Sequence, residues 1–548
     1  MTAGQNNEDI QNLPRVNLKD RQLYDLELLM VGGFSPLTGF MNEGDYKRVV
    51  KEMRLEDGRL FPIPVVLDVP ESFSHQVGDR ILLCDAFGNP LSVLEVESIY
   101  APDKQKEVGS VYGTSDDAHP GVRYVLYNMH NRYVGGTITP VALPKRHDFL
   151  HLRHTPGELK KLFKERGWDK VVGFQTRNPM HRAHFELVKR AHKKIGAPVL
   201  VHPVVGMTKP GDVDYVTRVR TYNVVKKNYG GDFMHLALLP LAMRMGGPRE
   251  ALWHAIIRRN YGCTHFIIGR DHAGPGKDKN GRPFYEPYAA RDLALKHSHE
   301  LGIEIVPSEE IAYSEKRRDY ISHDELEAGE KTIDISGTEF RRMLNAGEDI
   351  PEWFSFPESI NILRESVRRD TRPGLVLFFT GLPSAGKSTI AELLIARLQE
   401  IQDRSITFLD GDVVRQHLSK GLGFSREDRD ENVKRLGFVA SEIAKHGGIT
   451  ICAQIAPYRD TRQFVRNMVL HHGVFIEIYI STSLEECEKR DPKGLYAKAR
   501  KGEIKGFTGV DDPYEAPQTP EINIDTSRHT PQEAVEIIID YLHQEKLL

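Results

Sequence analysis

Apolar runs alternate with amphipathic segments through the middle of the chain. The run 170–176 (KVVGFQT) precedes the helical pattern of 181–196, and similar apolar runs occupy 197–206, 233–241 and 264–271. Pro248 opens a further helical stretch, PREALWHAIIRRNYG, and Gly262 can close it, since helices favour proline at the start and glycine at the end. This alternation predicts a parallel sheet covered by helices.

The last third of the chain repeats this pattern. The run 375–380 (LVLFFT) is followed by a glycine loop and by a helix with apolar residues four apart at Ile390, Leu394 and Leu398. Further apolar runs occupy 405–410, 448–455 and 474–482. We expect a second parallel-sheet domain there. The proline-rich, charged stretch 351–374 lacks the repeat and predicts an interdomain linker.

The first 165 residues differ, because short apolar stretches such as 61–70 and 80–96 are separated by turn signals. This pattern indicates a β-rich domain. The predicted fold is therefore a multidomain α/β protein. Its parts are a β-rich domain over 1–165, an α/β domain over 166–350, a linker over 351–374 and a second α/β domain over 375–548.

Composition and charge restrict the partners. The 548 residues are 40% hydrophobic and 28% charged, as in globular proteins, and 74 basic against 77 acidic residues give a net charge of −3. No overall field draws such a protein to nucleic acid or to an anionic membrane, so we expect neither as a partner. The polar, acidic start MTAGQNNEDI is unlike a signal peptide, and no run reaches the ~18 apolar residues of a membrane span. We expect a cytoplasmic protein.

The cysteines argue against a zinc site. They are far apart and lie in or beside apolar runs, at Cys84, Cys263, Cys452 and Cys487. Zinc sites need closely spaced ligands such as C-x-x-C pairs. We therefore predict buried, reduced thiols and no bound zinc.

The glycine loop of the last third carries the strongest motif. Residues 381–388 (GLPSAGKS) fit G-x-x-x-x-G-K-[ST] between an apolar strand and a helix, which is the setting of a phosphate-binding loop. Its backbone N–H groups would surround ATP phosphates, Lys387 would reach the β and γ phosphates, and the Ser388 hydroxyl would hold the Mg²⁺ that accompanies ATP. The predicted ATP-binding residues are Gly381, Leu382, Pro383, Ser384, Ala385, Gly386, Lys387, Ser388 and Thr389.

The segments after this loop indicate which reaction its bound ATP would serve. Asp410 and Asp412 end the next strand beside the phosphates, and a carboxylate there could accept a proton from an attacking hydroxyl. The basic, glycine-punctuated stretch 490–515 could close as a lid. The motifs LDGD, GFSREDRDENVKR, PYR, DPKGLYAKARKGEIKGFTG and PYEAPQTPE resemble those of adenylylsulfate (APS) kinases across nearly all of 375–545.

That resemblance implies transfer of the ATP γ-phosphate to the 3′-hydroxyl of APS. It implies that Phe424 and Phe507 sandwich the acceptor adenine and that Asp412 orients the hydroxyl. It also implies APS contacts from Arg415, Arg429, Asn432, Lys493 and Lys498. Many relatives have serine before Pro-Tyr-Arg, where this chain has Ala456. A phosphoserine is impossible there, so we expect direct in-line transfer.

A histidine motif marks the middle domain. His181 and His184 lie three residues apart in QTRNPMHRAH, at the start of the predicted helix 181–196. Both rings would project from one face near the positive end of the helix dipole, which suits nucleotide phosphates. A metal pair and a purely structural pair are the alternatives, although the zincin motif His-Glu-x-x-His is not present.

Two later segments carry related chemistry. GRDHAGPG (269–276) ends a predicted strand in a glycine turn whose N–H groups could bind an oxyanion. ISGTEFRR (335–342) places hydroxyls and arginines at a predicted helix start. Together with LYDLELLMVGGFSPLTGFM (23–41), these motifs resemble ATP sulfurylases over most of 1–350.

This second resemblance implies a PUA-like domain over 1–165 and a Rossmann-like nucleotidyltransferase domain over 166–350. It implies that a sulfate oxygen attacks the α-phosphorus of ATP, releasing pyrophosphate and forming APS. Gln175, Arg177 and the N–H of Ala273 would hold sulfate, and ATP would be contacted by Thr176, Asn178, His181, His184, Gly269, Arg270, Asp271 and His272. The catalytic set would be Thr176, Arg177, Asn178, His181 and His184, with Lys387 and Asp412 in the second domain.

The whole chain resembles fused sulfurylase–kinase proteins that make 3′-phosphoadenylylsulfate from sulfate and two ATP. An alternative is a sulfurylase whose C-terminal domain is a non-catalytic module that senses the final product, but the intact Lys387 and Ser388 favour catalysis. The same residues would also serve the reverse reaction, ATP synthesis from APS. The resemblance further implies small-molecule substrates only and a homo-oligomer.

Overall fold

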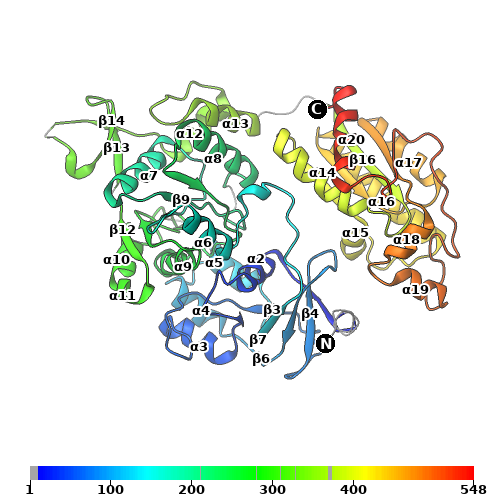
Figure 1. The fold of residues 1–548 in the computed structure, drawn as a ribbon, viewed down its shortest axis with the longest axis horizontal. Coiled ribbons are helices and arrows are strands. Elements are labelled where there is room, and N and C mark those ends of the chain that lie inside the picture. The colour runs from blue at the N-terminus through cyan, green and yellow to red at the C-terminus, as the bar shows by residue number, and fades with distance from the viewer. Residues whose placement is uncertain are drawn as a thin grey trace. The chain divides into compact units, whose positions relative to one another are not determined.

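The computed structural model describes residue 10 and residues 12–209, 212–278, 280–308, 310–327, 329–367 and 373–548 (Figure 1). Contacts divide the chain into two compact units, which we describe separately. The first holds 1–145 and 149–364, and the second holds 146–148 and 365–548. In the described residues, no helix is both long and apolar enough to cross a membrane.

The first unit begins with a sheet in the order β1-β4-β5-β7-β2, and β3 and β6 also pair with β7. Most pairs are antiparallel, for example Leu82 with Val93, whereas β1 and β4 run parallel. The predicted β-rich domain is confirmed, although helices cover it. The strands are β1 Arg15–Asn17, β2 Gly39–Phe40, β3 Leu67–Val69, β4 Arg80–Cys84, β5 Pro90–Glu95, β6 Ser98–Tyr100 and β7 Arg132–Pro140; the helices are α2 Asp20–Met30, α3 Glu43–Glu52, α4 Lys104–Val111 and α5 Pro120–Arg123, followed by a π-helical turn Tyr124–Asn128.

A parallel sheet in the order β10-β9-β8-β11-β12 follows, as the apolar runs predict. Side chains of successive strand residues point to opposite faces. Val199 and Val201 therefore pack in one cluster with helices α7 and α8, and Leu200 packs in another with α9. The strands are β8 Val172–Phe174, β9 Val199–Val201, β10 Met234–Leu236, β11 His265–Ile268 and β12 Glu304–Pro307; the helices are α6 Pro156–Glu165, α7 Arg182–Ile195, α8 Tyr215–Tyr229, α9 Gly247–Asn260, α10 Ala289–Lys296 and α11 Ser298–Leu301.

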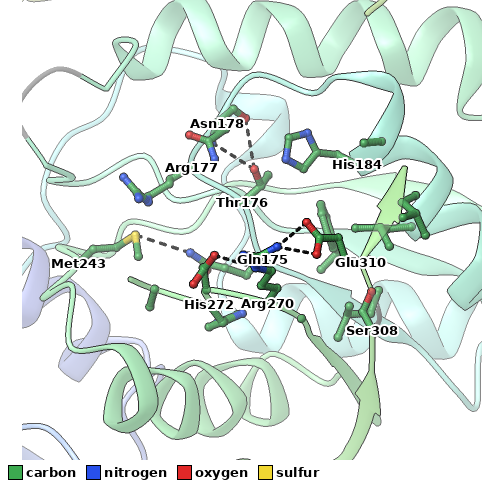
Figure 2. Close-up of a pocket in the computed structure, with 18 residues that line it drawn as sticks. Gln175, Thr176, Arg177, Asn178, His184, Met243, Arg270, His272, Ser308 and Glu310 are labelled. Carbon is green, nitrogen blue, oxygen red and sulfur yellow. Dashed lines mark hydrogen bonds and ion pairs between the residues drawn. The ribbon is translucent and has the colours of Figure 1, made fainter. Parts of the chain in front are cut away.

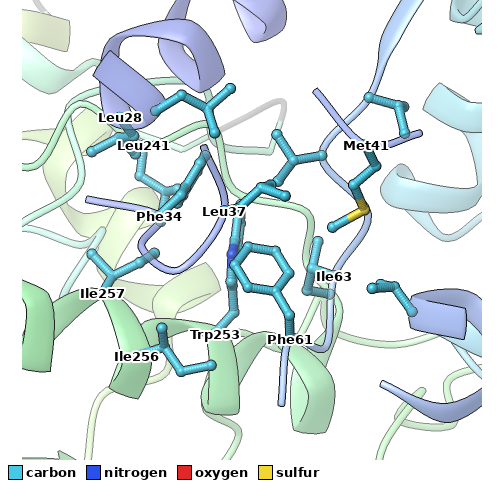
Figure 3. Close-up of a cluster of buried hydrophobic side chains, with 14 of the residues drawn as sticks. Leu28, Phe34, Leu37, Met41, Phe61, Ile63, Leu241, Trp253, Ile256 and Ile257 are labelled. Atoms are coloured by element: carbon cyan, nitrogen blue, oxygen red, sulfur yellow. The ribbon is translucent and has the colours of Figure 1, made fainter. Parts of the chain in front are cut away.

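Helix α9 is buried nearly all round. Its Trp253 stacks on Phe34 with ring centroids 4.8 Å apart, and Ile256 and Ile257 join the same apolar cluster (Figure 3). This packing ties the helix to the N-terminal part of the unit. A small antiparallel sheet in the order β14-β13-β15 and helix α12 complete the unit; their bounds are β13 Ile311–Ser314, β14 Asp319–Ser322, β15 Thr332–Ile333 and α12 Gly337–Ala346.

The stretch 351–374, where the sequence predicts a linker, contains a helix, α13 Pro357–Val367. Ile360 and Leu363 of this helix are buried against Phe340 and Leu344 of α12. Apolar residues at this spacing make α13 part of the first unit up to Arg364, so the chain passes between the units beyond that residue. Residues 368–372 of the predicted linker lie outside the described residues.

The second unit is a parallel sheet in the order β17-β18-β16-β19-β20, as predicted. The alternating residues of β16 pack on both faces: Leu377 and Phe379 toward α14 and α20, and Val376 and Phe378 toward α16 and α17. The strands are β16 Gly374–Gly381, β17 Ile406–Asp410, β18 Ile449–Ala453, β19 Gly473–Ile480 and β20 Ile522–Ile524; the helices are α14 Lys387–Ile401, α15 Gly411–His417, α16 Arg426–Lys445, α17 Arg459–Leu470, α18 Leu484–Arg490, α19 Leu495–Arg500 and α20 Pro531–Gln544.

Candidate functional sites

A pocket of about 340 Å³ opens at the carboxyl ends of β8 and β11 in the first unit (Figure 2). This is where ligands bind in open α/β sheets. The structure brings together there most of the residues predicted for the middle domain. Those lining the pocket are Gln175, Thr176, Arg177, Asn178, His184, Gly269, Arg270, Asp271, His272 and Ala273, joined by Phe174, Ala183, Leu187, Met243, Ile267, Ser308, Glu310 and Ile311.

The turn after β8 is held by buried side chains beneath it. The Thr176 hydroxyl accepts from the Asn178 N–H at 3.2 Å, and the Tyr222 hydroxyl donates to the Asn178 carbonyl at 2.5 Å. The buried Arg218 donates to the Arg177 carbonyl at 3.0 Å. These bonds fix the backbone of the turn, so its side chains are presented to the pocket with little freedom.

Arg177 is held by protein groups. It donates to the Asp212 carboxylate at 2.6 Å and to the Gly274 carbonyl at 3.1 Å, and both members of the ion pair are largely buried. A guanidinium fork matches tetrahedral oxyanions as well as carboxylates. An oxyanion entering the pocket would therefore meet Asp212 as a competitor for Arg177.

The two histidines of the motif take different places. His184 lines the pocket, and desolvation lowers its pKa to about 4. His181 caps α7, with its ring between Phe340 and Phe354 and its Nδ1 2.9 Å from the Ser355 hydroxyl; it is not among the pocket-lining residues. Desolvation and His184 lower the pKa of His181 to about 3. At neutral pH, both rings are therefore uncharged in this structure.

The segment 269–276 forms the predicted turn. Asp271 and Ala273 adopt left-handed backbone angles, with φ of 52° and 56°, and Gly274 donates to the Asp271 carbonyl at 3.0 Å. Arg270 pairs with Glu310 across the pocket at 2.5 Å (Figure 2). The His272 ring lies 3.0 Å from the ring of the buried His254, between Nε2 and Nδ1.

The third motif, 335–342, begins a helix as predicted. Ser336 caps α12 by accepting from the Glu339 N–H at 3.2 Å. None of its residues lines the pocket. Met243, Ser308 and Glu310, which do, carry no motif in the sequence, because loops far apart along the chain bring them to the pocket.

The phosphate-loop motif of the second unit joins β16 to α14 as predicted. Gly386 and Ser384 have φ of 104° and 62°, angles that wrap the backbone into an anion cradle. The Lys387 ammonium donates to the carbonyls of Gly381 and Leu382 at 2.9 and 2.7 Å. Burial lowers the pKa of Lys387 to about 8.

Two oxygen groups beside this loop suit a magnesium ion. The Ser388 hydroxyl donates to the Asp410 carboxylate at 2.8 Å, and the other oxygen of that carboxylate accepts from the Asp412 N–H at 2.9 Å. Mg²⁺ prefers hard oxygen ligands and is usually bound by one or two protein groups together with phosphates and waters. The residues therefore fit Mg²⁺ arriving with ATP. No cluster of three or more His, Cys, Asp or Glu side chains suited to a metal occurs within the described ranges.

Two of the predicted acceptor-site residues contact Asp412 or the predicted lid, residues 490–515. The Lys493 ammonium contacts the Asp412 carboxylate at 2.6 Å, and Arg429 bonds to Asp512, Thr508 and the Gly506 carbonyl. Arg429 thus ties helix α16 to the lid residues.

The two aromatic residues of the predicted adenine clamp pack against different neighbours. Phe424 is 66% exposed with Arg415 4.4 Å above its ring, and Phe507 packs edge-on against Tyr496. Asn432 is buried and donates to Gln454 at 3.1 Å. Lys498, on α19, is exposed. The clamp itself remains a prediction.

Family models match consecutive parts of the chain. They are a PUA-like domain over 2–143, ATP-sulfurylase over 150–366 and adenylylsulphate kinase over 373–525. A sulfate adenylyltransferase from Phaeosphaeria nodorum is 50% identical over 98% of this chain and 95% of its own length, and one from Coccidioides immitis matches to the same extent. The chain belongs to the sulfate adenylyltransferase family. It is an enzyme of that family in which an APS kinase domain follows the sulfurylase domain.

A solved structure, described as a hexameric APS kinase from Thiobacillus denitrificans, is 35% identical and covers 98% of this chain and 95% of its own, with a TM-score of 0.57. The two family resemblances drawn from the sequence motifs are therefore confirmed. The order, with the sulfurylase domain before the kinase domain, is confirmed as well. In this sulfate adenylyltransferase family member, the pocket at β8 and β11 lies in the ATP-sulfurylase part and the loop at Lys387 lies in the kinase part.

Proposed function

We propose that the chain carries out two successive reactions, each in its own α/β sheet. The pocket at β8 and β11 would join sulfate to the α-phosphate of ATP and release pyrophosphate. The loop at Lys387 would then serve transfer of a second γ-phosphate to the 3′-hydroxyl of APS. The observation that carries the proposal is the coexistence in one chain of a pocket lined by Gln175, Arg177 and His184 with an intact phosphate loop.

In the first site, the pocket supplies alignment and charge. Sulfate carries no proton to remove and is a weak nucleophile, so the reaction needs positioning and stabilisation of charge more than a base. Arg177 and Gln175 would hold the oxyanion, and the backbone of the turn 269–276 would contribute N–H groups. A neutral His184 would act as a hydrogen-bond donor to the nucleotide phosphates, since its depressed pKa keeps it uncharged.

In the second site, Lys387 would leave the loop carbonyls that it bonds in this structure and pair with the ATP phosphates. Ser388 and Asp410 would hold Mg²⁺, which neutralises phosphate charge when bound. Asp412 lies at the start of α15 beside Asp410, where it could orient the acceptor hydroxyl once Lys493 releases it. Direct transfer is supported by Ala456, which has no hydroxyl to phosphorylate.

We also propose a homo-oligomer working in the cytoplasm. Phe438, Phe464 and Leu470 on α16 and α17 are between 48% and 58% exposed, and large exposed apolar groups are typical of subunit contacts. The four cysteines are free and buried, which suits a reducing compartment. Sedimentation of the wild type and of Phe438→Ser would test the contact, and a wild-type monomer would refute it.

The activity test is incubation of the purified chain with sulfate, MgATP and pyrophosphatase, followed by chromatography of the adenylates. We expect 3′-phosphoadenylylsulfate from the wild type, APS alone from Lys387→Ala, and neither from His184→Ala unless APS is supplied. APS as the only product of the wild type would refute the kinase step. A product-sensitive sulfate saturation curve would then assign the second unit to regulation.

A further inference from the structure

The buried helix α9 carries a polar stripe beneath the sulfurylase pocket. Glu250, His254 and Arg258 lie four residues apart, so they share one face of the helix, and each is fully buried. The rest of the helix packs apolar residues, among them Trp253 and Ile256, into the core (Figure 3). A charged stripe inside a core is costly unless it is paired, so its contacts indicate its role.

The first two members of the stripe pair with each other. Glu250 accepts from the N–H groups of Arg244 and Gly246 at 2.8 Å, and it lies 3.4 Å from His254 Nε2. Burial raises the pKa of Glu250, but these bonds outweigh burial and leave the pKa below its ordinary value. His254 in turn contacts His272 in the pocket wall. This end of the stripe has a charge partner within the protein, although the 3.4 Å contact leaves His254 Nε2 without a hydrogen bond among the described residues.

Arg258 differs, because it forms no ion-pair contact within the described part of the chain; Glu250 acts on it only through its charge, and its guanidinium lies 5.5 Å from the centroid of the Phe266 ring. One of its terminal nitrogens donates to the Gln175 side-chain oxygen and to the His202 carbonyl, the latter at 2.9 Å. Its Nε and other terminal nitrogen find no hydrogen-bond partner among the residues that the structure describes. Its stem is fixed by close packing, since a Cβ on Gly173 would lie 3.0 Å from Arg258 Cγ.

The contact with Gln175 determines which way that side chain points. Because a guanidinium can only donate, it must face the carbonyl oxygen of the amide. The Gln175 NH₂ group is then turned toward Met243, whose sulfur lies 3.6 Å away in the pocket wall. The amide thus offers donors, rather than an acceptor, to a ligand.

We propose that Arg258 is a positioning residue for the oxyanion substrate: it fixes the Gln175 amide as a donor and places an unpaired buried charge behind it. A bound dianion would be the missing counter-charge. The proposal rests on the proposed function, in which Gln175 contacts sulfate. It predicts that Arg258 affects the binding of sulfate and has little effect on the binding of ATP.

The test compares Arg258→Met with Arg259→Met, a neighbour on the same helix whose guanidinium donates to the Leu301 carbonyl at 2.9 Å. We expect Arg258→Met to raise the KM for sulfate about tenfold or more while the KM for ATP stays within about twofold. Arg258→Lys should recover part of the loss, and Arg259→Met should change neither KM. Equal increases in both KM values, or an unchanged sulfate KM, would overturn the proposal.

A charge effect is separable from a packing effect. We expect Arg258→Met to weaken binding of thiosulfate, a dianion, more than binding of chlorate, a monoanion. Equal weakening of both would contradict a role for the Arg258 charge behind Gln175. If Arg258→Met does not fold, a double-mutant cycle of Arg258→Lys with Gln175→Ala replaces it. Coupling of the two sulfate effects is expected, and additivity would refute positioning through Gln175. A wild type that makes no APS would refute the proposed function instead.

Discussion

Arg177 donates to Asp212 at 2.6 Å, so the guanidinium of the sulfurylase pocket is already neutralised by a carboxylate of its own chain. Under the proposed function, sulfate would displace this carboxylate or share the guanidinium with it. Removing the Arg177 guanidinium and removing the Asp212 charge should therefore change sulfate binding in opposite directions.

Arg177→Ala should weaken sulfate use far more than ATP use, because it removes a fixed pair of donors for the oxyanion. Loss of one such charged contact costs on the order of 2–4 kcal/mol in the transition state. Steady-state kinetics with each substrate varied in turn measure the effect. An unchanged sulfate KM with a raised ATP KM would place Arg177 at the nucleotide.

Asp212→Asn should lower the KM for sulfate, since the amide keeps the shape of the carboxylate but competes less for Arg177. We expect a change of at least about threefold, because this pair is largely buried and an exposed pair is worth up to about 1 kcal/mol. Asp214→Asn is the matched control, because Asp214 caps α8 rather than contacting Arg177. A raised sulfate KM in Asp212→Asn would show that the carboxylate positions Arg177.

His184→Ala should abolish pyrophosphate release from ATP and sulfate while phosphorylation of supplied APS continues nearly unchanged. His184 lines the pocket of the first unit, and Lys387 belongs to the second. The two activities are assayed on one preparation, so the kinase rate serves as the internal control. Loss of both activities in a folded variant would contradict independent sites.

The histidine motif should make the first unit acid-sensitive. The folded pKa values of His181 and His184, about 3 and about 4, lie below the ordinary value of 6.5. The unfolded chain therefore binds more protons between pH 6.5 and 4, and stability is present above that window and falls as pH drops through it.

The expected loss from pH 7 to 5 is about 1 kcal/mol for each histidine, discounted for partial exposure. Urea unfolding of His181→Phe at both pH values should show a smaller difference than the wild type, even if the variant is less stable at pH 7. An identical difference would mean that His181 titrates normally in the folded protein.

Lys387→Ala and Asp412→Asn should each reduce APS phosphorylation by at least ~10²-fold, the size of effect seen when a positioned catalytic group is lost. APS should still bind both variants, because neither residue belongs to the predicted adenine clamp. Equilibrium binding and kinase rates together check this. Asp403→Asn, on the loop before β17, is the control substitution and should leave the rate unchanged. A kinase rate that survives in Asp412→Asn would remove this carboxylate from the reaction.

Sequence patterns predicted both parallel sheets because apolar runs and glycine turns are local signals. The strands β8, β9, β11, β16 and β18 all fall inside or within a residue of the expected runs. The helix within 351–374 was missed because its prolines indicated a break, whereas Pro357 occupies the first position of the helix, where proline is favoured. Met243 and Glu310 could not be placed in the pocket, nor Asp212 beside Arg177, because their positions depend on long-range packing. His181 was placed with His184 by spacing alone, yet aromatic neighbours from α12 and beyond hold it out of the pocket wall.

Because α9 is mostly buried, only a few of its positions can be substituted freely. Only Pro248, Arg249 and Arg259 of this helix are more than marginally accessible; every other position touches either the core or the stripe beneath the pocket. A randomised library over 247–260 should therefore yield active clones with diversity concentrated at those three positions. Directed evolution of this enzyme would find little room at the buried positions of α9, because they pack against the core or belong to the stripe that contacts Gln175 and His272.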